Sequence, residues 1–117
     1  MPNTTQLKNA LAYDFLHAKV DGASGTSVHA TAPDGDTLNF IGHGFTYNSN
    51  GVSGGTVTDI DVHALGVTMH IAGNFNAHAL YADVTAAQHG YYAPLLALAH
   101  GHHVGVDLPH GHFDFVL

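Results

Sequence analysis

The stretch GFTYNSNGVSGGTVTDIDVHALGVTMHI, residues 44–71, decides the fold of this chain, because its second half alternates between polar and apolar residues. The clearest case is its end, where Val67, Met69 and Ile71 alternate with Thr68 and His70. Side chains on a strand point alternately to the two faces of a sheet. The pattern therefore predicts a strand with one apolar face, and it places His70 on the polar face.

Turn-forming residues divide this region into antiparallel strands. Residues 48–51, Asn-Ser-Asn-Gly, tolerate the positive φ that a hairpin tip needs, and Pro33-Asp34-Gly35-Asp36 forms a second turn. The strands predicted beside these two turns span residues 27–32, 38–41, 44–47 and 56–62. We therefore expect a central antiparallel sheet from about residue 26 to residue 72.

Helices are predicted on both sides of this sheet. Asn3 and Gln6 form a capping pair at the start of an apolar stripe, and Asp21-Gly22 is expected to end that helix. Asn76 is a second candidate cap, and Pro94 suits a first helical turn, so one or two helices are expected between residues 76 and 100. The predicted fold class is α+β, as a single domain over residues 1–117. The N-terminal stripe consists of Leu7, Ala10, Leu11, Phe15, Ala18 and Val20.

Composition excludes several classes of function. The chain has 9 Asp and Glu in total against 2 Lys and Arg, and a formal charge of −7. Without a basic cluster, binding to nucleic acid or to an anionic lipid surface is not expected. The absence of cysteine excludes disulfides and thiolate metal sites. No apolar run reaches the roughly 18 residues of a membrane span.

The C-terminal residues suggest where the protein works. Asp114-Phe115-Val116-Leu117, one acid followed by three apolar residues, resembles a bacterial type I secretion signal. Residues 1–5 lack the basic and apolar segments of a cleaved signal peptide, which fits that route. The resemblance implies an extracellular protein exported by type I secretion. The alternative is an ordinary amphipathic terminus or strand.

Histidine is abundant, with 12 residues in 117, and five of these lie in the C-terminal segment 100–117. Its two His-x-His patterns place alternate imidazoles on one face of a strand, where they can reach one cation. Nitrogen donors favour zinc, copper or nickel over calcium, and Asp107 or Asp114 can add an oxygen or orient a ring. The alternative is a His-rich tract that binds metal without defined geometry. The candidate ligands are His100, His102, His103, His110 and His112.

Residues 40–81 resemble the β-rich modules that precede calcium-binding nonapeptide repeats in type I secreted RTX-type proteins. The matching segments are Gly44-Phe45-Thr46-Tyr47, Asn50-Gly51, Gly54-Gly55-Thr56-Val57-Thr58 and Ala79-Leu80-Tyr81. The resemblance implies an exported, non-catalytic, strand-rich unit. The repeats themselves are missing, and Asp34-Gly35-Asp36-Thr37-Leu38 is only half of one. Calcium is therefore not expected at this turn.

Two shorter segments, Thr46-Tyr47 and Ala77-His78-Ala79-Leu80-Tyr81, are similar to motifs of secreted haemophores, which bind haem through tyrosine and histidine. The resemblance implies that Tyr47 is the iron ligand and that His78 hydrogen-bonds its phenolate. In haemophores the two elements are close in sequence, whereas here about thirty residues separate them. His29 and His43 flank the first hairpin near Tyr47, so either is a candidate second axial ligand.

An enzyme is not expected from these residues. The chain has no Glu for a zincin motif and no Gly-x-Ser-x-Gly elbow. The expected function is a secreted binding protein that captures haem or a transition metal through histidine, with tyrosine as a further candidate ligand. The alternative is a self-assembling extracellular filament or matrix subunit, in which exposed strand edges join protomers and histidines lie at the contacts.

Overall fold

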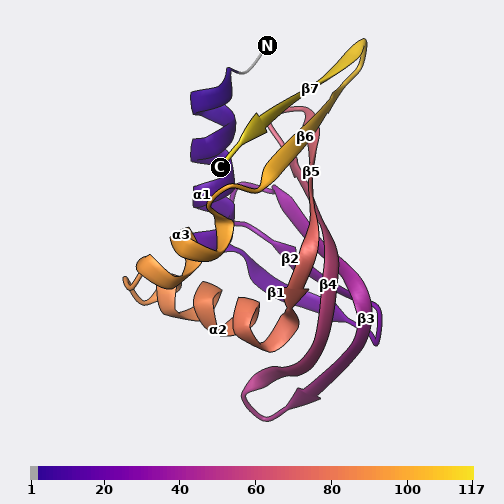
Figure 1. The fold of residues 1–117 in the computed structure, drawn as a ribbon, viewed down its shortest axis with the longest axis vertical. Helices are drawn as coiled ribbons and strands as arrows, with labels where there is room; N and C mark the ends of the chain where they lie inside the picture. Colours follow the sequence, from indigo (N-terminus) through magenta and orange to yellow (C-terminus); the bar gives the residue numbers. More distant parts are fainter. Residues whose placement is uncertain (1–2) are drawn as a thin grey trace.

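The computed structural model describes residues 3–117, and in this range one seven-stranded antiparallel sheet carries three helices on one face (Figure 1). The strands follow one another across the sheet in chain order, from β1 to β7. The helices are α1 (Thr4–His17), α2 (Ala77–Gln88) and α3 (Ala93–Ala99). The strands are β1 (Lys19–Ala23), β2 (Ser27–Thr31), β3 (Thr37–Asn48), β4 (Gly51–Ala64), β5 (Val67–Asn76), β6 (His103–Leu108) and β7 (Gly111–Val116). The predicted α+β class is confirmed.

The N-terminal helix begins as predicted and ends earlier. The backbone N–H of Gln6 donates to Asn3 Oδ1 at 2.8 Å, and that of Asn3 donates to Gln6 Oε1 at 2.9 Å. The expected end at Asp21-Gly22 is wrong, because α1 ends at His17 and residues 19–23 form β1. Asp21 explains the difference, since its carboxylate accepts hydrogen bonds from Thr31 and His29 of β2.

The predicted strands are present, and the sheet extends beyond residues 26–72 to include β1, β6 and β7. Residues 38–41 and 44–47, predicted as separate strands, belong to one long β3 that is interrupted by register shifts between Ile41 and Tyr47. Gly42 lies at this irregularity, where a Cβ atom would come within 1.8 Å of the Thr56 carbonyl oxygen. Only glycine fits such a close approach of two backbones.

The hydrophobic core lies between the sheet and the helices. Met69 of β5, Val104 and Val106 of β6 and Leu7 of α1 are all fully buried and belong to one core cluster. Asn76 caps α2 as predicted, since Oδ1 accepts the N–H of Ala79 at 2.9 Å. Pro94 lies in the first turn of α3, also as predicted.

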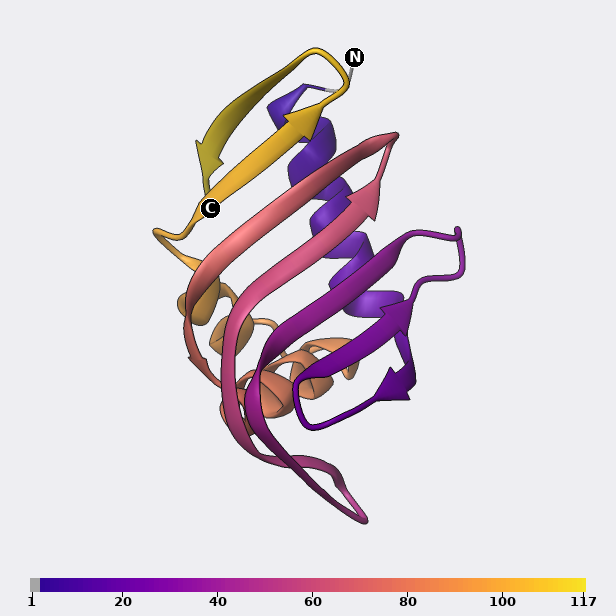
Figure 2. The same cartoon turned by 90° about the vertical axis from the view of Figure 1, so that its right-hand side faces the viewer.

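The opposite face of the sheet has no helix over it, as Figure 2 shows with all three helices behind the strands. We call this the outer face. The C-terminal residues 114–116 belong to β7, and Phe115 is buried in the core, so the strand interpretation of the tail is correct as far as structure goes. Within residues 3–117, none of the helices has the length and apolar character needed to cross a membrane.

Candidate functional site

Two regions of the molecule are candidate sites. One consists of rows of histidine and aspartate side chains on the outer face, and the other is an apolar groove under the helices. The outer-face rows follow from strand register. In one row Asp61 of β4 pairs with His70 of β5, which pairs with Gly105 of β6 and then Asp114 of β7. The adjacent row consists of His63, Thr68, Asp107 and His112.

His70 lies between two carboxylates. Its Nδ1 is 2.6 Å from Asp61 Oδ1, and its Nε2 is 2.7 Å from Asp107 Oδ2. A neutral imidazole has one N–H, so only the charged ring can donate to both partners. The carboxylate of Asp61, followed by that of Asp107, accordingly raises the pKa of His70 above its usual value. His70 therefore links β4, β5 and β6, and both contacts favour the charged form of its ring.

His112 extends this network to the edge of the sheet. Its Nδ1 is 2.8 Å from Asp107 Oδ1, and its Nε2 is 3.0 Å from Asp114 Oδ1. Its pKa is also raised, mainly by Asp107, while hydrogen bonds from His112 and His70 lower the pKa of Asp107. Gly105 leaves room for the ring, because a Cβ there would lie 3.2 Å from His112 Cε1.

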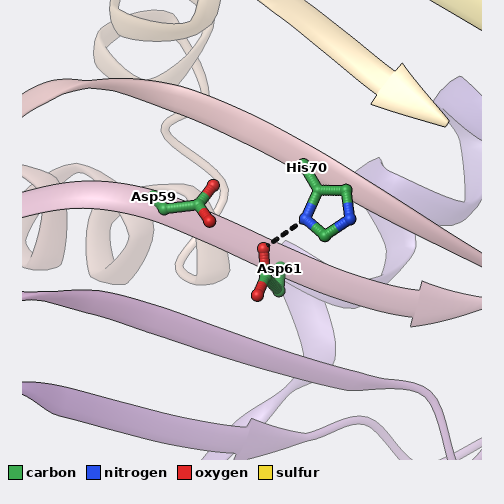
Figure 3. A group of neighbouring side chains, drawn as sticks. All are labelled: Asp59, Asp61 and His70. Atoms are coloured by element: carbon green, nitrogen blue, oxygen red, sulfur yellow. Dashed lines mark hydrogen bonds and ion pairs between the residues drawn. The ribbon is translucent and has the colours of Figure 1, made fainter. Parts of the chain in front are cut away.

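Asp59, Asp61 and His70 form the part of this network that resembles a metal centre (Figure 3). All three are half-buried, and their donor atoms lie within 4.8 Å of one another. Two carboxylates and an imidazole suit a transition metal ion, and the bond from His70 Nε2 to Asp107 would fix the ring. In this structure His70 Nδ1 lies within hydrogen-bond distance of Asp61 Oδ1. The same donors can thus hold a proton or an ion.

This group was not predicted as a site, although the sequence contained its signal. Sequence reasoning placed His70 on the polar face but did not connect it to Asp61. A hairpin turn at Leu65-Gly66 brings these two residues opposite each other. The link to Asp107 required the order of β5 and β6, which are separated by two helices.

The groove lies between α1 and α3 and has the β4 and β5 side chains as its floor. Its volume is about 490 Å³, and its walls are mainly leucine and phenylalanine side chains. Four polar side chains border it: Lys8, Tyr92, His100 and His102. The His102 ring packs against Phe75, with 4.7 Å between the ring centres. A second apolar cavity, of about 280 Å³, lies between α2 and strands β1–β4.

The five predicted metal ligands are distributed over different places. His100 and His102 border the groove, His112 lies on the outer face, and His103 and His110 are exposed on β6 and in the turn after it. Within residues 3–117, the groups of three or more donors that lie close enough for one ion include none of the five. The Asp107 and Asp114 carboxylates contact the His112 ring, at 2.8 Å and 3.0 Å, and their predicted role beside a metal stays a prediction.

The four predicted haem ligands are not brought together around an apolar cavity. Tyr47 lies near the β3–β4 tip, where its hydroxyl donates to the Ser24 carbonyl oxygen. His78 is exposed in the first turn of α2, His43 is exposed on β3, and His29 bonds to Asp21. In the described part of the chain none of the four borders either cavity. Their roles stay predictions.

Comparison of this chain with protein-family models, with curated proteins and with solved structures finds no match. The resemblances to RTX-type modules and to haemophores consequently stay predictions that rest on short sequence motifs.

Proposed function

We propose that this chain is a non-enzymatic binding protein that captures haem in the groove between α1 and α3. The observation that supports this most directly is an apolar groove of about 490 Å³ with two imidazoles at its border. Sites for small ligands are typically apolar clefts of about 300–1,000 Å³ with a few polar groups. On the resemblance of residues 114–117 to a type I signal, we place this capture outside the cell.

The helix α3 favours a ligand in this position. Its sequence, APLLALA, is entirely apolar, yet none of its residues is buried, and Leu96 is 67% exposed. It packs mainly on α2, and its three leucines border the groove: Leu95 and Leu98 are half-buried against the core, whereas Leu96 is exposed. A flat apolar ligand between α1 and α3 would remove this surface from water, and that burial favours binding.

The polar border favours haem over a lipid. His100 and His102 have no side-chain hydrogen bond within residues 3–117, so their ring nitrogens can donate a lone pair to iron. Lys8, one of two lysines in the chain, can pair with a propionate carboxylate. Because iron requires the neutral imidazole, mild acid should release the ligand.

The test is a titration of the purified protein with hemin, followed by the Soret absorbance. Saturation at one hemin per chain is expected, and the double variant His100→Ala/His102→Ala should bind at least about 10-fold more weakly. The matched control is His103→Ala/His110→Ala, which removes two histidines of the same segment that do not border the groove. Control affinity should equal that of the wild type.

Iron-free protoporphyrin IX separates the contribution of the apolar walls to binding from that of the histidine–iron bonds. It should bind weakly and equally to the wild type and to both double variants, because only the apolar walls can hold it. Ala12→Trp should block both porphyrins, since Ala12 is an exposed residue of α1 beside the groove. Ala82→Trp, at an exposed position of α2 away from the groove, is its control. Absence of saturable hemin binding, or binding unaffected by Ala12→Trp, would refute the proposal.

A second candidate function, self-assembly, is favoured by the edges of the sheet. Among residues 3–117, β1 pairs only with β2 and β7 pairs only with β6, and every residue of β1 is exposed. Open edges are where strands of separate molecules pair. Light scattering should then show particles at neutral pH that dissociate near pH 5, as histidines gain charge. A monomer at all concentrations would exclude assembly.

A further inference from the structure

Asp14 is the one charged residue that is fully buried in the described part of the chain, with 0% of its surface exposed. It lies near the C-terminal end of α1, and neither of its carboxylate oxygens has a hydrogen-bond partner. A buried carboxylate without partners is unfavourable, because it loses its hydration without compensation. The negative end of the α1 dipole adds to this penalty. Such a group needs a proton or a cation.

The groups that face Asp14 are also acidic. Asp34 and Asp36 come from the turn between β2 and β3, and the donor oxygens of the three carboxylates lie within 4.8 Å of one another. Burial, together with Asp36 and Asp34, raises the pKa of Asp14 to about 8. Within residues 3–117, none of the three forms an ion pair with lysine or histidine. Their mutual repulsion is therefore not balanced by a positive side chain.

Two hydrogen bonds and a glycine with positive φ shape the turn that carries these oxygens. The backbone N–H of Asp36 donates to Asp34 Oδ1 at 3.0 Å, and that of Gly35 donates to the Ala32 carbonyl at 3.0 Å. Gly35 has φ of 94°, which favours glycine. Asp34 is exposed and Asp36 is half-buried, so the cluster is open to solvent on one side and closed by Asp14 on the other.

The chemical type of the three donor atoms indicates which cation would bind here. All three donors are carboxylate oxygens, which hard cations prefer, whereas zinc and copper prefer nitrogen or sulfur. Calcium accepts six to eight oxygens in a flexible geometry, so three carboxylates on one side leave the open side for water. Magnesium demands a stricter octahedron and releases its water reluctantly.

We propose that Asp14, Asp34 and Asp36 bind a calcium ion that joins the end of α1 to the β2–β3 turn. Calcium was not expected at residues 34–38 because half of one repeat cannot form the stacked turns of calcium-binding repeats, and the turn alone supplies only two carboxylates. The third ligand comes from a helix 20 positions earlier in the chain. A cation there balances the buried carboxylate and holds α1 against the sheet.

The experiment uses the full chain, freed of metal with a chelator at neutral pH, and calcium chloride as the probe. Calcium should raise the melting temperature by about 5 °C and bind with one-to-one stoichiometry in calorimetry. Asp14→Asn should lose both the heat and the thermal shift, while its own metal-free melting temperature should exceed that of the wild type. Magnesium at the same concentration should give a markedly smaller shift.

Two further variants keep the test decisive if Asp14→Asn fails to fold. Asp34→Asn/Asp36→Asn changes only the turn and should abolish the calcium response. Asp83→Asn removes an acid of α2 outside the cluster and should retain the response. The proposal is overturned if wild-type stability is unaffected by calcium, or if calcium stabilises the turn variant as much as the wild type.

Discussion

The two faces of the sheet use the same strands for different physical purposes. On the covered face, residues such as Met69 and Val106 have no exposed surface and pack against the helices. On the outer face, their neighbours His70 and Asp107 remain accessible and bond to each other across strands. Interactions on the covered face depend on side-chain volume and burial, whereas hydrogen bonds on the outer face depend on which imidazoles are protonated.

Because of this difference, the covered face should determine the stability of the fold, and the outer face should determine how that stability varies with pH. Loss of a buried side chain removes apolar contacts that no solvent condition restores. Loss of an outer-face bond removes an interaction that water and salt already weaken. We therefore expect large effects of substitution on the covered face that do not vary with pH, and small effects on the outer face that do.

The largest contrast is expected within one strand. Met69→Ala should lower the free energy of unfolding by about 2–5 kcal/mol, because it leaves a cavity at a residue with 0% exposure. Thr68→Ala, one position away, removes only a hydrogen bond to His63 and should cost less than about 1 kcal/mol. Urea denaturation of both variants measures the difference. Equal losses would contradict the division between the faces.

Asp14 is the exception on the covered side, because an ionisable carboxyl group is buried there. Its pKa rises from 3.8 to about 8, so the folded protein keeps a proton that the unfolded chain releases between these values. Stability should therefore fall as pH rises through this window. In calcium-free buffer at about pH 8, Asp14→Asn should raise the free energy of unfolding by about 1–3 kcal/mol. The gain should vanish at about pH 4, and a gain that persists there would contradict the assignment.

His70 tests the proton dependence of the outer face. Its pKa in the folded state is raised above 6.5, so its contribution is complete below that pH and is lost as pH rises through the folded-state value. Since the ring is partly exposed, the contribution should be less than about 1 kcal/mol. The stability difference between wild type and His70→Gln should shrink as pH rises from about 6. NMR titration of the His70 ring should give a pKa above 6.5, and a lower value would refute the two-carboxylate arrangement.

The smallest effect is expected at Gly105. An alanine Cβ there would lie 3.2 Å from His112 Cε1 and 3.3 Å from Asp114 Oδ1, so the flexible ring must move. Gly105→Ala should change stability by no more than about 0.5 kcal/mol, yet return the pKa of His112 toward its usual value. Gly25→Ala, where a Cβ meets nothing within 4 Å, is the control. An unchanged His112 pKa in Gly105→Ala would show that the ring does not need this space.

Local sequence determined much of the architecture. The Asn3 and Gln6 capping pair, the Asn76 cap and the alternation at residues 67–71 each appear in the structure as predicted. These features depend on residues within a few positions of one another, where spacing fixes geometry. The end of α1 was missed, because the bonds from Asp21 to His29 and Thr31 outweighed the helical spacing of Val20.

The candidate sites depended on contacts that no local pattern contains. His70 meets Asp107 because β6 returns beside β5 after two helices, and Asp14 meets Asp36 because α1 packs against a distant turn. The groove likewise exists only where α1 and α3 lie apart over the sheet. The sequence by itself thus determined the helix starts, most of the central strands and the two faces of the sheet, because periodicity and capping act over a few residues. Tertiary structure alone decided which histidines and aspartates lie close enough to interact, because Coulomb and hydrogen-bond energies depend on distance in space rather than along the chain.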